Sequence, residues 1–256
     1  MPQVAFRLGA EPVFTYTVLV YLGLLTAVLL LAREGWRRGW GRLRVLEMLA
    51  WAVVPGVLGG RAAYVLETWL AVPGQVGHLA QPWGDGLSLP GGILAGAGGL
   101  AILAAWHGRS FGEFLGAAAP GAALAQAMGW LGAAAHGAQA GLAVVPRPWW
   151  APVMRDLYGQ ALPRFPLQYL AAVLCLGAWA LISWQLRSDW ARVACFGLLT
   201  GWGICALLWG AEQRSVVWAG LSADQLGYAL IGVLGAASAL AVPRRRTMLR
   251  RAKSLP

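Results

Sequence analysis

Charged residues are scarce in this chain. Only 12% of its 256 residues are Asp, Glu, Lys or Arg, and 59% are hydrophobic, whereas soluble domains average about 25% charged and about 45–50% apolar residues. The sequence also lacks a Ser-His-Asp arrangement, an HExxH or Walker motif and a paired-carboxylate site, and Cys175, Cys195 and Cys205 form no CxxC pair. We therefore expect a membrane protein with no metal site, no cofactor and no disulfide framework.

Long apolar segments fill most of the sequence. A membrane-spanning helix needs about 20 apolar residues, and seven segments meet or approach this length: 13–32, 45–66, 87–106, 112–137, 166–186, 191–210 and 223–242. The fourth is rich in Gly and Ala, which predicts a place in the interior of the bundle. The predicted fold is all-α, a polytopic bundle of seven transmembrane helices, with one membrane domain at 1–243 and a basic tail at 244–256.

The basic residues are concentrated in alternate connections between the apolar segments. They follow the first, third, fifth and seventh segments, and the connection from Glu67 to Gly86 has no Lys or Arg. This positive-inside pattern predicts an N-terminus outside and a C-terminus in the cytoplasm. It also explains the net charge of +10 without nucleic acid. The tail can attract anionic lipid as well, but a topology signal is the simpler interpretation.

Arg61 stands out because it lies inside the second apolar segment. A charge at the centre of a transmembrane helix costs about 2.5–3.5 kcal/mol, so it usually has a partner or a ligand. Its position predicts the outer half of the bilayer, and Tyr64 follows on the same helical face. Together they offer a forked cation and a hydroxyl to a phosphate or carboxylate. The alternatives are an arginine that snorkels to the surface or pairs with Glu67.

Three further features have both a functional and a structural interpretation. His136 ends the fourth segment and is either a catalytic group or a packing residue. Pro90-Gly91-Gly92 opens the third segment, either as an irregular anion-binding entry or as a plain helix start. The outer connection at 139–165 contains four prolines and two tryptophans, which disfavours a long helix there and suits the membrane interface.

Several motifs, in order, give the chain a resemblance to a known family. They are Phe14-Thr15-Tyr16 with Tyr21-Leu22-Gly23, Gly59-Gly60-Arg61-Ala62-Ala63-Tyr64-Val65, Leu87-Ser88-Leu89-Pro90-Gly91-Gly92, Gly129-Trp130-Leu131-Gly132 with His136-Gly137, and Pro163-Arg164-Phe165-Pro166-Leu167-Gln168. This set resembles bacterial prolipoprotein diacylglyceryl transferases. That resemblance implies seven transmembrane helices with the N-terminus outside, in a multi-pass protein of the bacterial cytoplasmic (inner) membrane.

The sequence departs from the family pattern at charged and polar positions. Pro90 replaces the histidine of the glycine-rich segment, and Trp130 replaces the signature arginine that is thought to bind the lipid phosphate. Further replacements are Ala133, His136 and Ala138 in the signature, Phe165 in the proline-rich motif, and Gly203, Leu207 and Gly210 in the late charged motif. The residues that match are Arg61, Tyr64, Arg164 and Gln168.

The resemblance implies transfer of a diacylglyceryl group from phosphatidylglycerol, or another anionic phospholipid, to the lipobox cysteine of a preprolipoprotein signal peptide. In a divergent transferase, Arg61 and Arg164 would hold the phosphate. Tyr64, Gln168 and Tyr16 would complete substrate binding, and His136 would be the base. The alternative is a non-catalytic paralogue that binds phospholipid or lipoprotein signal peptides, which the missing charges favour. A small-molecule transporter fits less well, because no polar pathway across the midplane is visible.

Overall fold

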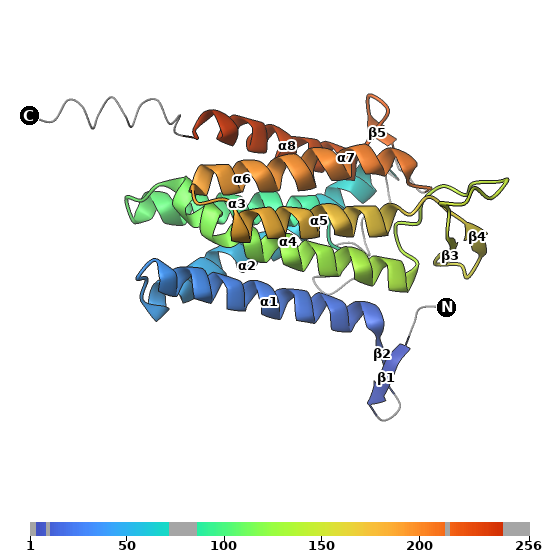
Figure 1. Ribbon diagram of the computed structural model, residues 1–256, viewed down its shortest axis with the longest axis horizontal. Coiled ribbons are helices and arrows are strands. Elements are labelled where there is room, and N and C mark those ends of the chain that lie inside the picture. The colour runs from blue at the N-terminus through green and yellow to red at the C-terminus, as the bar shows by residue number, and fades with distance from the viewer. Residues whose placement is uncertain (1–3, 9–10, 72–85, 213–215, 243–256) are drawn as a thin grey trace, which may run out of the picture.

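The computed structural model describes residues 4–8, 11–71, 86–212 and 216–242. The all-α prediction is confirmed: seven long helical runs lie side by side (Figure 1). They are α1 (Thr15–Arg37), α2 (Arg42–Ala71), α3 (Leu89–Trp106), α4 (Phe111–His136), α5 (Leu167–Trp184), a composite run from Asp189 to Gly210, and α8 (Ala223–Leu240). The predicted basic tail at 244–256 lies outside the described residues.

Six of these runs are long and apolar enough to cross a membrane within the described part of the chain. The protein is therefore a multi-pass membrane protein. The remaining run, α4, is long enough but is not among these six. It packs most extensively on α1 and α5, and half of its 26 residues are buried, most of them Gly or Ala. This agrees with the interior position that its composition predicted.

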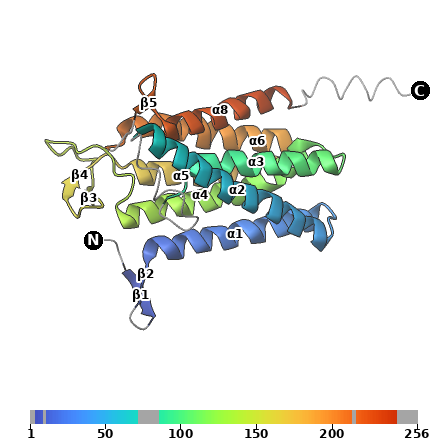
Figure 2. The ribbon, with the colours of Figure 1, turned by 180° about the vertical axis from the view of Figure 1, so that it is seen from behind.

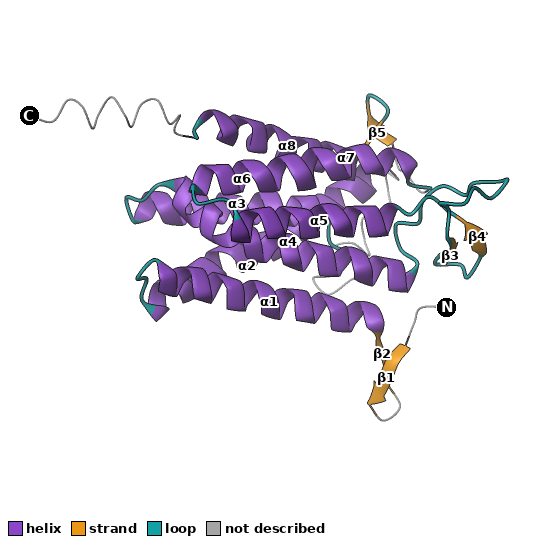
Figure 3. Ribbon diagram, in the orientation of Figure 1, coloured by secondary structure: helices purple, strands orange, loops and turns teal. Residues whose placement is uncertain are grey.

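Short β-hairpins decorate one end of the bundle, as Figure 3 shows in orange. They pair β1 (Val4–Leu8) with β2 (Glu11–Phe14), β3 (Val153–Arg155) with β4 (Ala161–Pro163), and β5 (Val216–Trp218) with β6 (Leu221–Ser222). We call this the hairpin end. The opposite end, with its tight connections at 38–41, 107–110 and 185–188, is the short-loop end. The connection at 139–165 contains β3 and β4 and no helix, as its prolines predicted.

Glycines allow α2 and α3 to pack with their backbones almost in contact, on the face seen in Figure 2. A Cβ on Gly99 would lie 2.0 Å from the Trp51 carbonyl oxygen, and one on Gly59 would lie 2.1 Å from the Ala95 Cβ. Small residues permit such close contacts between helices in a membrane, where dispersion replaces the hydrophobic effect. Gly92 and Gly96 also lie against the α2 backbone, at the carbonyl oxygens of Gly56 and Ala52.

The sixth predicted segment is a single helical run with two changes of geometry. It begins as α6 (Asp189–Phe196), widens into the π-helix η2 (Gly197–Trp202), and continues as α7 (Gly203–Leu207) and the 3-10 turn η3 (Leu208–Gly210). At the wide turn, Gly197 and Gly201 meet the α8 backbone at Gly235 and Gly232. Helical periodicity alone does not predict this turn, because it depends on the facing helix.

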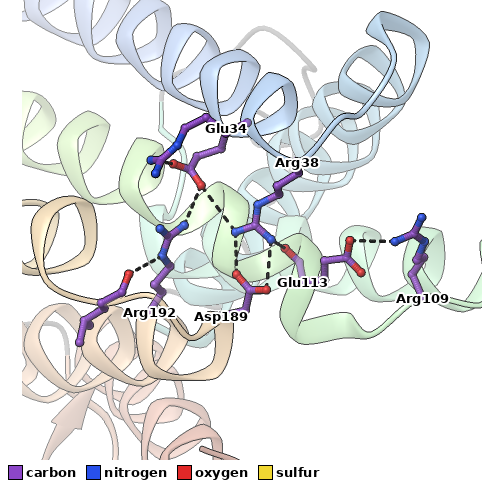
Figure 4. A network of polar contacts seen from close by, with 8 residues as sticks. Glu34, Arg38, Arg109, Glu113, Asp189 and Arg192 are labelled. Carbon is purple, nitrogen blue, oxygen red and sulfur yellow. Dashed lines mark hydrogen bonds and ion pairs between the residues drawn. The ribbon is translucent and has the colours of Figure 1, made fainter.

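Ion pairs connect α1 with α6 at the short-loop end (Figure 4), and Arg38 also donates a hydrogen bond to the Glu113 carbonyl oxygen of α4 at 3.3 Å. Arg192 of α6 contacts the Glu34 carboxylate at 2.7 Å, and Arg38 makes a bidentate contact with Asp189 at 2.6 and 3.1 Å. Burial alone would lower the pKa of Arg38, but the hydrogen bond and the charge of Asp189 raise it above its ordinary value. The arginines that indicate membrane topology in the sequence therefore also connect helices through ion pairs.

Candidate functional site

Arg61 and Tyr64 lie together on α2 near the hairpin end, as their spacing predicted. The guanidinium carbon of Arg61 is 5.5 Å from the centre of the Tyr64 ring, within cation–π range. Arg61 also donates a hydrogen bond from Nη1 to the Gly86 carbonyl oxygen at 2.8 Å. The structure thus gives one cation a fixed position in a membrane helix. Its predicted role in phosphate binding stays a prediction.

Gly86 holds this pair in place for two reasons. Its φ of +101° is a conformation that residues with a side chain rarely adopt. A Cβ there would also lie only 2.3 Å from the Tyr64 ring. Glycine is therefore required both by the backbone and by the close approach of the tyrosine.

Two carboxylates at the hairpin end, Glu67 of α2 and Asp224 of α8, were not predicted as site residues. The Ser88 hydroxyl donates to the Glu67 carboxylate at 2.9 Å, and the Ser88 backbone N–H donates to the Gly60 carbonyl oxygen at 3.0 Å. Asp224, in the first turn of α8, interacts electrostatically with Glu67. One local signal near Asp224 was present in the sequence: Ser222 and Gln225 form a capping box that fixes the start of α8.

Pro90 and Ser88 begin α3 in an ordinary way. Ser88 is the N-cap, its hydroxyl accepts a hydrogen bond from the Gly91 N–H, and Pro90 lies in the first turn. The interpretation as a plain helix start is therefore confirmed. Pro90 packs against α8, where a Cβ on Gly227 would lie 2.7 Å from its ring.

His136 and Tyr16 form a second group, where α4 ends beside the start of α1. Their ring centres are 5.5 Å apart, and the Phe14 ring is 6.3 Å from the histidine. The His136 Nδ1 is buried and has no hydrogen-bond partner among the described residues. An imidazole nitrogen can donate or accept a hydrogen bond, depending on the tautomer. Its catalytic role stays a prediction.

Gln168 is fully buried in the first turn of α5 and connects that helix to the end of α4. Its Nε2 donates to the Ala138 carbonyl oxygen at 2.9 Å. Its Oε1 has no partner among the described residues. Gln168 therefore contacts the chain two residues after His136. Asp224 links this group to the first, because it accepts a hydrogen bond from Gln139 at 3.3 Å.

Arg164 lies in a separate cluster that its sequence motif did not reveal. Its side chain is fully buried and contacts the carboxylates of Asp156, at 2.9 Å, and Glu212. It also donates to the Gly141 carbonyl oxygen at 3.2 Å. Two carboxylates already offset its charge, which favours a role in positioning the β3–β4 hairpin. The predicted contact with a lipid phosphate has no direct support in these contacts and stays a prediction.

A metal centre would need several His, Cys, Asp or Glu side chains close together in the part of the chain that the structure describes. Within that part of the chain, no three His, Cys, Asp or Glu residues converge as metal ligands would. The hairpin end instead offers a fixed arginine, two carboxylates and one unpartnered imidazole nitrogen. Such a set can bind a polar headgroup and transfer a proton.

Comparison with known proteins connects this arrangement to one family. The sequence model of prolipoprotein diacylglyceryl transferase matches residues 3–206. The phosphatidylglycerol–prolipoprotein diacylglyceryl transferase of Frankia alni is 37% identical over 126 residues, which cover 48% of this chain and 33% of the relative. That of Bacillus licheniformis is 32% identical over 126 residues, which cover 49% of this chain and 47% of the relative. A second such transferase of Clostridium perfringens is 28% identical over 120 residues, 47% of each chain. The chain thus spans between about a third and a half of the curated relatives it matches. Since the family match covers well over half of the sequence, the chain belongs to the prolipoprotein diacylglyceryl transferase family.

Proposed function

We propose that this protein transfers a diacylglyceryl group from phosphatidylglycerol to the lipobox cysteine of a preprolipoprotein. The observation that carries the proposal is the fixed Arg61 at the hairpin end, held by the Gly86 carbonyl and the Tyr64 ring. A guanidinium suits a phosphate because its planar donors match phosphate oxygens. The names of the relatives indicate the reaction, and Arg61 offers a binding position for the anionic headgroup.

The proposed topology puts the hairpin end outside and the short-loop end in the cytoplasm of a bacterium. The arginines of the short connections support it, because Arg38, Arg42, Arg109 and Arg187 all lie at or near the short-loop end. In this arrangement α4 is the seventh transmembrane helix, residues 1–243 form one membrane domain, and the tail at 244–256 is cytoplasmic. The proposed location is the cytoplasmic (inner) membrane.

In the proposed reaction the substrate thiol attacks the glyceryl carbon that bears the phosphate. A carbon–sulfur bond forms, the carbon–oxygen bond breaks, and glycerol phosphate leaves with the bonding electrons. Arg61 offsets the charge of the phosphate as it departs, and His136 takes the thiol proton at Nδ1. Tyr64 and Gln168 orient the glyceryl group, and Tyr16 holds the imidazole ring. A positioned donor of this kind typically contributes about 10²–10³ in rate.

A second candidate function is a non-catalytic paralogue that binds phospholipid or lipoprotein signal peptides. Arg164 favours it, because Asp156 and Glu212 already offset its charge. Trp130 favours it too, since it replaces the arginine that the family is thought to use for the phosphate. In the divergent transferase, Arg61 would have to supply most of the positive charge at the headgroup.

The test uses purified protein in nanodiscs with phosphatidylglycerol and a lipobox peptide, and measures the peptide mass. Arg61→Ala and His136→Ala should each lower the rate at least about a hundredfold. Arg109→Ala is the matched control and should leave it unchanged, because Arg109 is half exposed at the short-loop end.

Lipidation that survives Arg61→Ala contradicts the site assignment. No lipidation by the unmutated protein contradicts the transferase. If that protein still binds phosphatidylglycerol vesicles or the peptide, the paralogue is supported instead.

A further inference from the structure

Two arginines and a tryptophan form an exposed group at the last turn of α1, at the short-loop end. Arg33, Trp36 and Arg37 follow the spacing i, i+3 and i+4, so they share one face of the helix. Trp36 is 68% exposed, the Arg37 side chain is 57% exposed, and Arg33 is exposed as well. This group lies at the opposite end of the bundle from Arg61.

The same face of α1 continues toward the hairpin end as a stripe of leucines. Leu22, Leu25 and Leu29 precede Arg33 at helical spacing and are 45%, 53% and 59% exposed. The opposite face contains the buried Leu31 and packs mainly on α4. In Figures 1 and 2, α1 lies at the edge of the bundle. Since α1 is one of the helices able to cross a membrane, this leucine stripe faces lipid chains.

The length of α1 puts its last turn at the boundary of the hydrocarbon core. The helix has 23 residues, which is about 34 Å at about 1.5 Å per residue, against a hydrocarbon core of about 30 Å. Trp36 suits this boundary, where tryptophan is enriched. A lipid chain that lies along the leucine stripe therefore brings its phosphate to the level of Arg33 and Arg37.

The last turn of α1 has more positive than negative charge around it. The ion-pair network there (Figure 4) joins three arginines to two acids, so one positive charge is left over; its members are Arg37, Arg38, Arg192, Glu34 and Asp189. The neighbouring pair of Arg109 and Glu113 adds no net charge. Arg33 adds a second positive charge, and it makes no ion pair with any described residue.

These charges select an anionic headgroup. The planar guanidinium matches phosphate oxygens in pairs. It has five N–H donors, and Arg37 uses one of them for the Glu34 carboxylate at 3.1 Å. A zwitterionic headgroup would also bring an ammonium group, which the excess positive charge repels. A phosphodiester without an amine keeps the attraction and avoids the repulsion.

We propose that the last turn of α1 is a binding site for an anionic phospholipid. Its phosphate lies between Arg33 and Arg37, its glycerol contacts Trp36, and one acyl chain lies along the leucine stripe. In the proposed topology this lipid belongs to the cytoplasmic leaflet, so it is distinct from a substrate at Arg61. The proposal does not rest on the transferase activity, and its test measures binding alone.

The first experiment compares two headgroups on the same acyl chains. Delipidated protein in detergent is titrated with dioleoylphosphatidylglycerol or dioleoylphosphatidylcholine, and native mass spectrometry counts the bound lipids. The titration is repeated with Arg61→Ala, which removes the contribution of the proposed substrate site. In both proteins the first phosphatidylglycerol should bind at least about tenfold more tightly than the first phosphatidylcholine. Equal affinities for the two lipids overturn the proposal.

Variants then test the two arginines. Arg33→Gln breaks no ion pair among the described residues and should weaken the first phosphatidylglycerol about fivefold. Adding Arg37→Gln should remove the preference over phosphatidylcholine. Arg109→Gln is the matched control at the same end, because Glu113 already offsets the charge of Arg109, and it should leave the affinity unchanged. Equal losses in Arg33→Gln and Arg109→Gln indicate a diffuse surface attraction and overturn the site.

Crosslinking locates the lipid on the helix. A trace of phosphatidylglycerol with a photoreactive group midway along one chain is added to the protein in phosphatidylcholine nanodiscs. Crosslinks should concentrate on α1 between Leu22 and Arg33 and should decline in Arg33→Gln. Crosslinks spread evenly over the lipid-facing helices overturn the placement. Circular dichroism checks the fold of each variant, and Arg33→Gln alone decides if the double variant does not fold.

Discussion

Removing the Glu34 carboxylate should destabilise the protein more than removing any exposed acid. Glu34 and Arg192 form a nearly dry pair, with side chains only 11% and 8% exposed. Loss of one partner from a buried pair costs about 3–5 kcal/mol, because the other charge stays buried without compensation. When Glu34 is removed, Arg192 retains its hydrogen bond to the Leu186 carbonyl oxygen at 3.0 Å, and Arg38 retains its ion pair with Asp189. We therefore expect a value near the lower limit, about 3 kcal/mol.

The assay is thermal unfolding of Glu34→Ala in detergent, followed by circular dichroism. A loss of about 3 kcal/mol corresponds to about 6–12 °C for a chain of this size. Glu113→Ala is the matched control, since the side chains of Arg109 and Glu113 are 46% and 23% exposed and their pair should contribute less than about 1 kcal/mol. Replacing both Glu34 and Arg192 by Met should restore most of the stability. Equal losses for Glu34→Ala and Glu113→Ala would refute this reasoning.

Three other predictions use the same stability and binding assays. Gly99→Ala should lower the free energy of unfolding by about 1–3 kcal/mol, because the added Cβ would meet the Trp51 carbonyl oxygen. Gly98→Ala is the control, since its Cβ meets nothing within 4 Å and the change should be neutral or stabilising. Equal effects of the two substitutions would contradict the close packing of α2 on α3. Gly86→Ala should displace Tyr64 and weaken phosphatidylglycerol binding, while Gly108→Ala, also at positive φ but in open space, should leave binding unchanged. Arg164→Met should cost about 3–5 kcal/mol and expose the β3–β4 hairpin to proteolysis, and an intact hairpin in this variant would argue against the anchoring role.

The helices were predictable because hydropathy and helical periodicity are local properties of the sequence. The predicted segments match the observed runs to within a few residues, although α2 extends from Arg42 to Ala71, beyond the predicted 45–66. The π-helix at Gly197–Trp202 was not predictable, since it depends on the facing glycines of α8. Local patterns give helix positions, whereas changes of helix geometry arise from packing between helices.

The site was predictable only where its members are close in sequence. Arg61 and Tyr64 are three residues apart, so helical spacing alone placed them together. Arg164 contacts Glu212, 48 residues later, and Arg192 contacts Glu34, 158 residues earlier. Such pairs depend on the folded topology. A single sequence therefore identifies a charge in a membrane but does not say which partner neutralises it.

The composition of α4 has a consequence for how the protein is made. A helix whose buried residues are mainly Gly and Ala gives the translocation machinery a weak signal for release into lipid. Its extensive contacts with α1 and α5 provide the stability in the bilayer that its own hydropathy does not. During synthesis α1 emerges before α4, and α5 emerges after it, so we expect α4 to enter the bilayer stably only when both neighbours are available. The most central helix is then the one whose integration depends most on the rest of the chain.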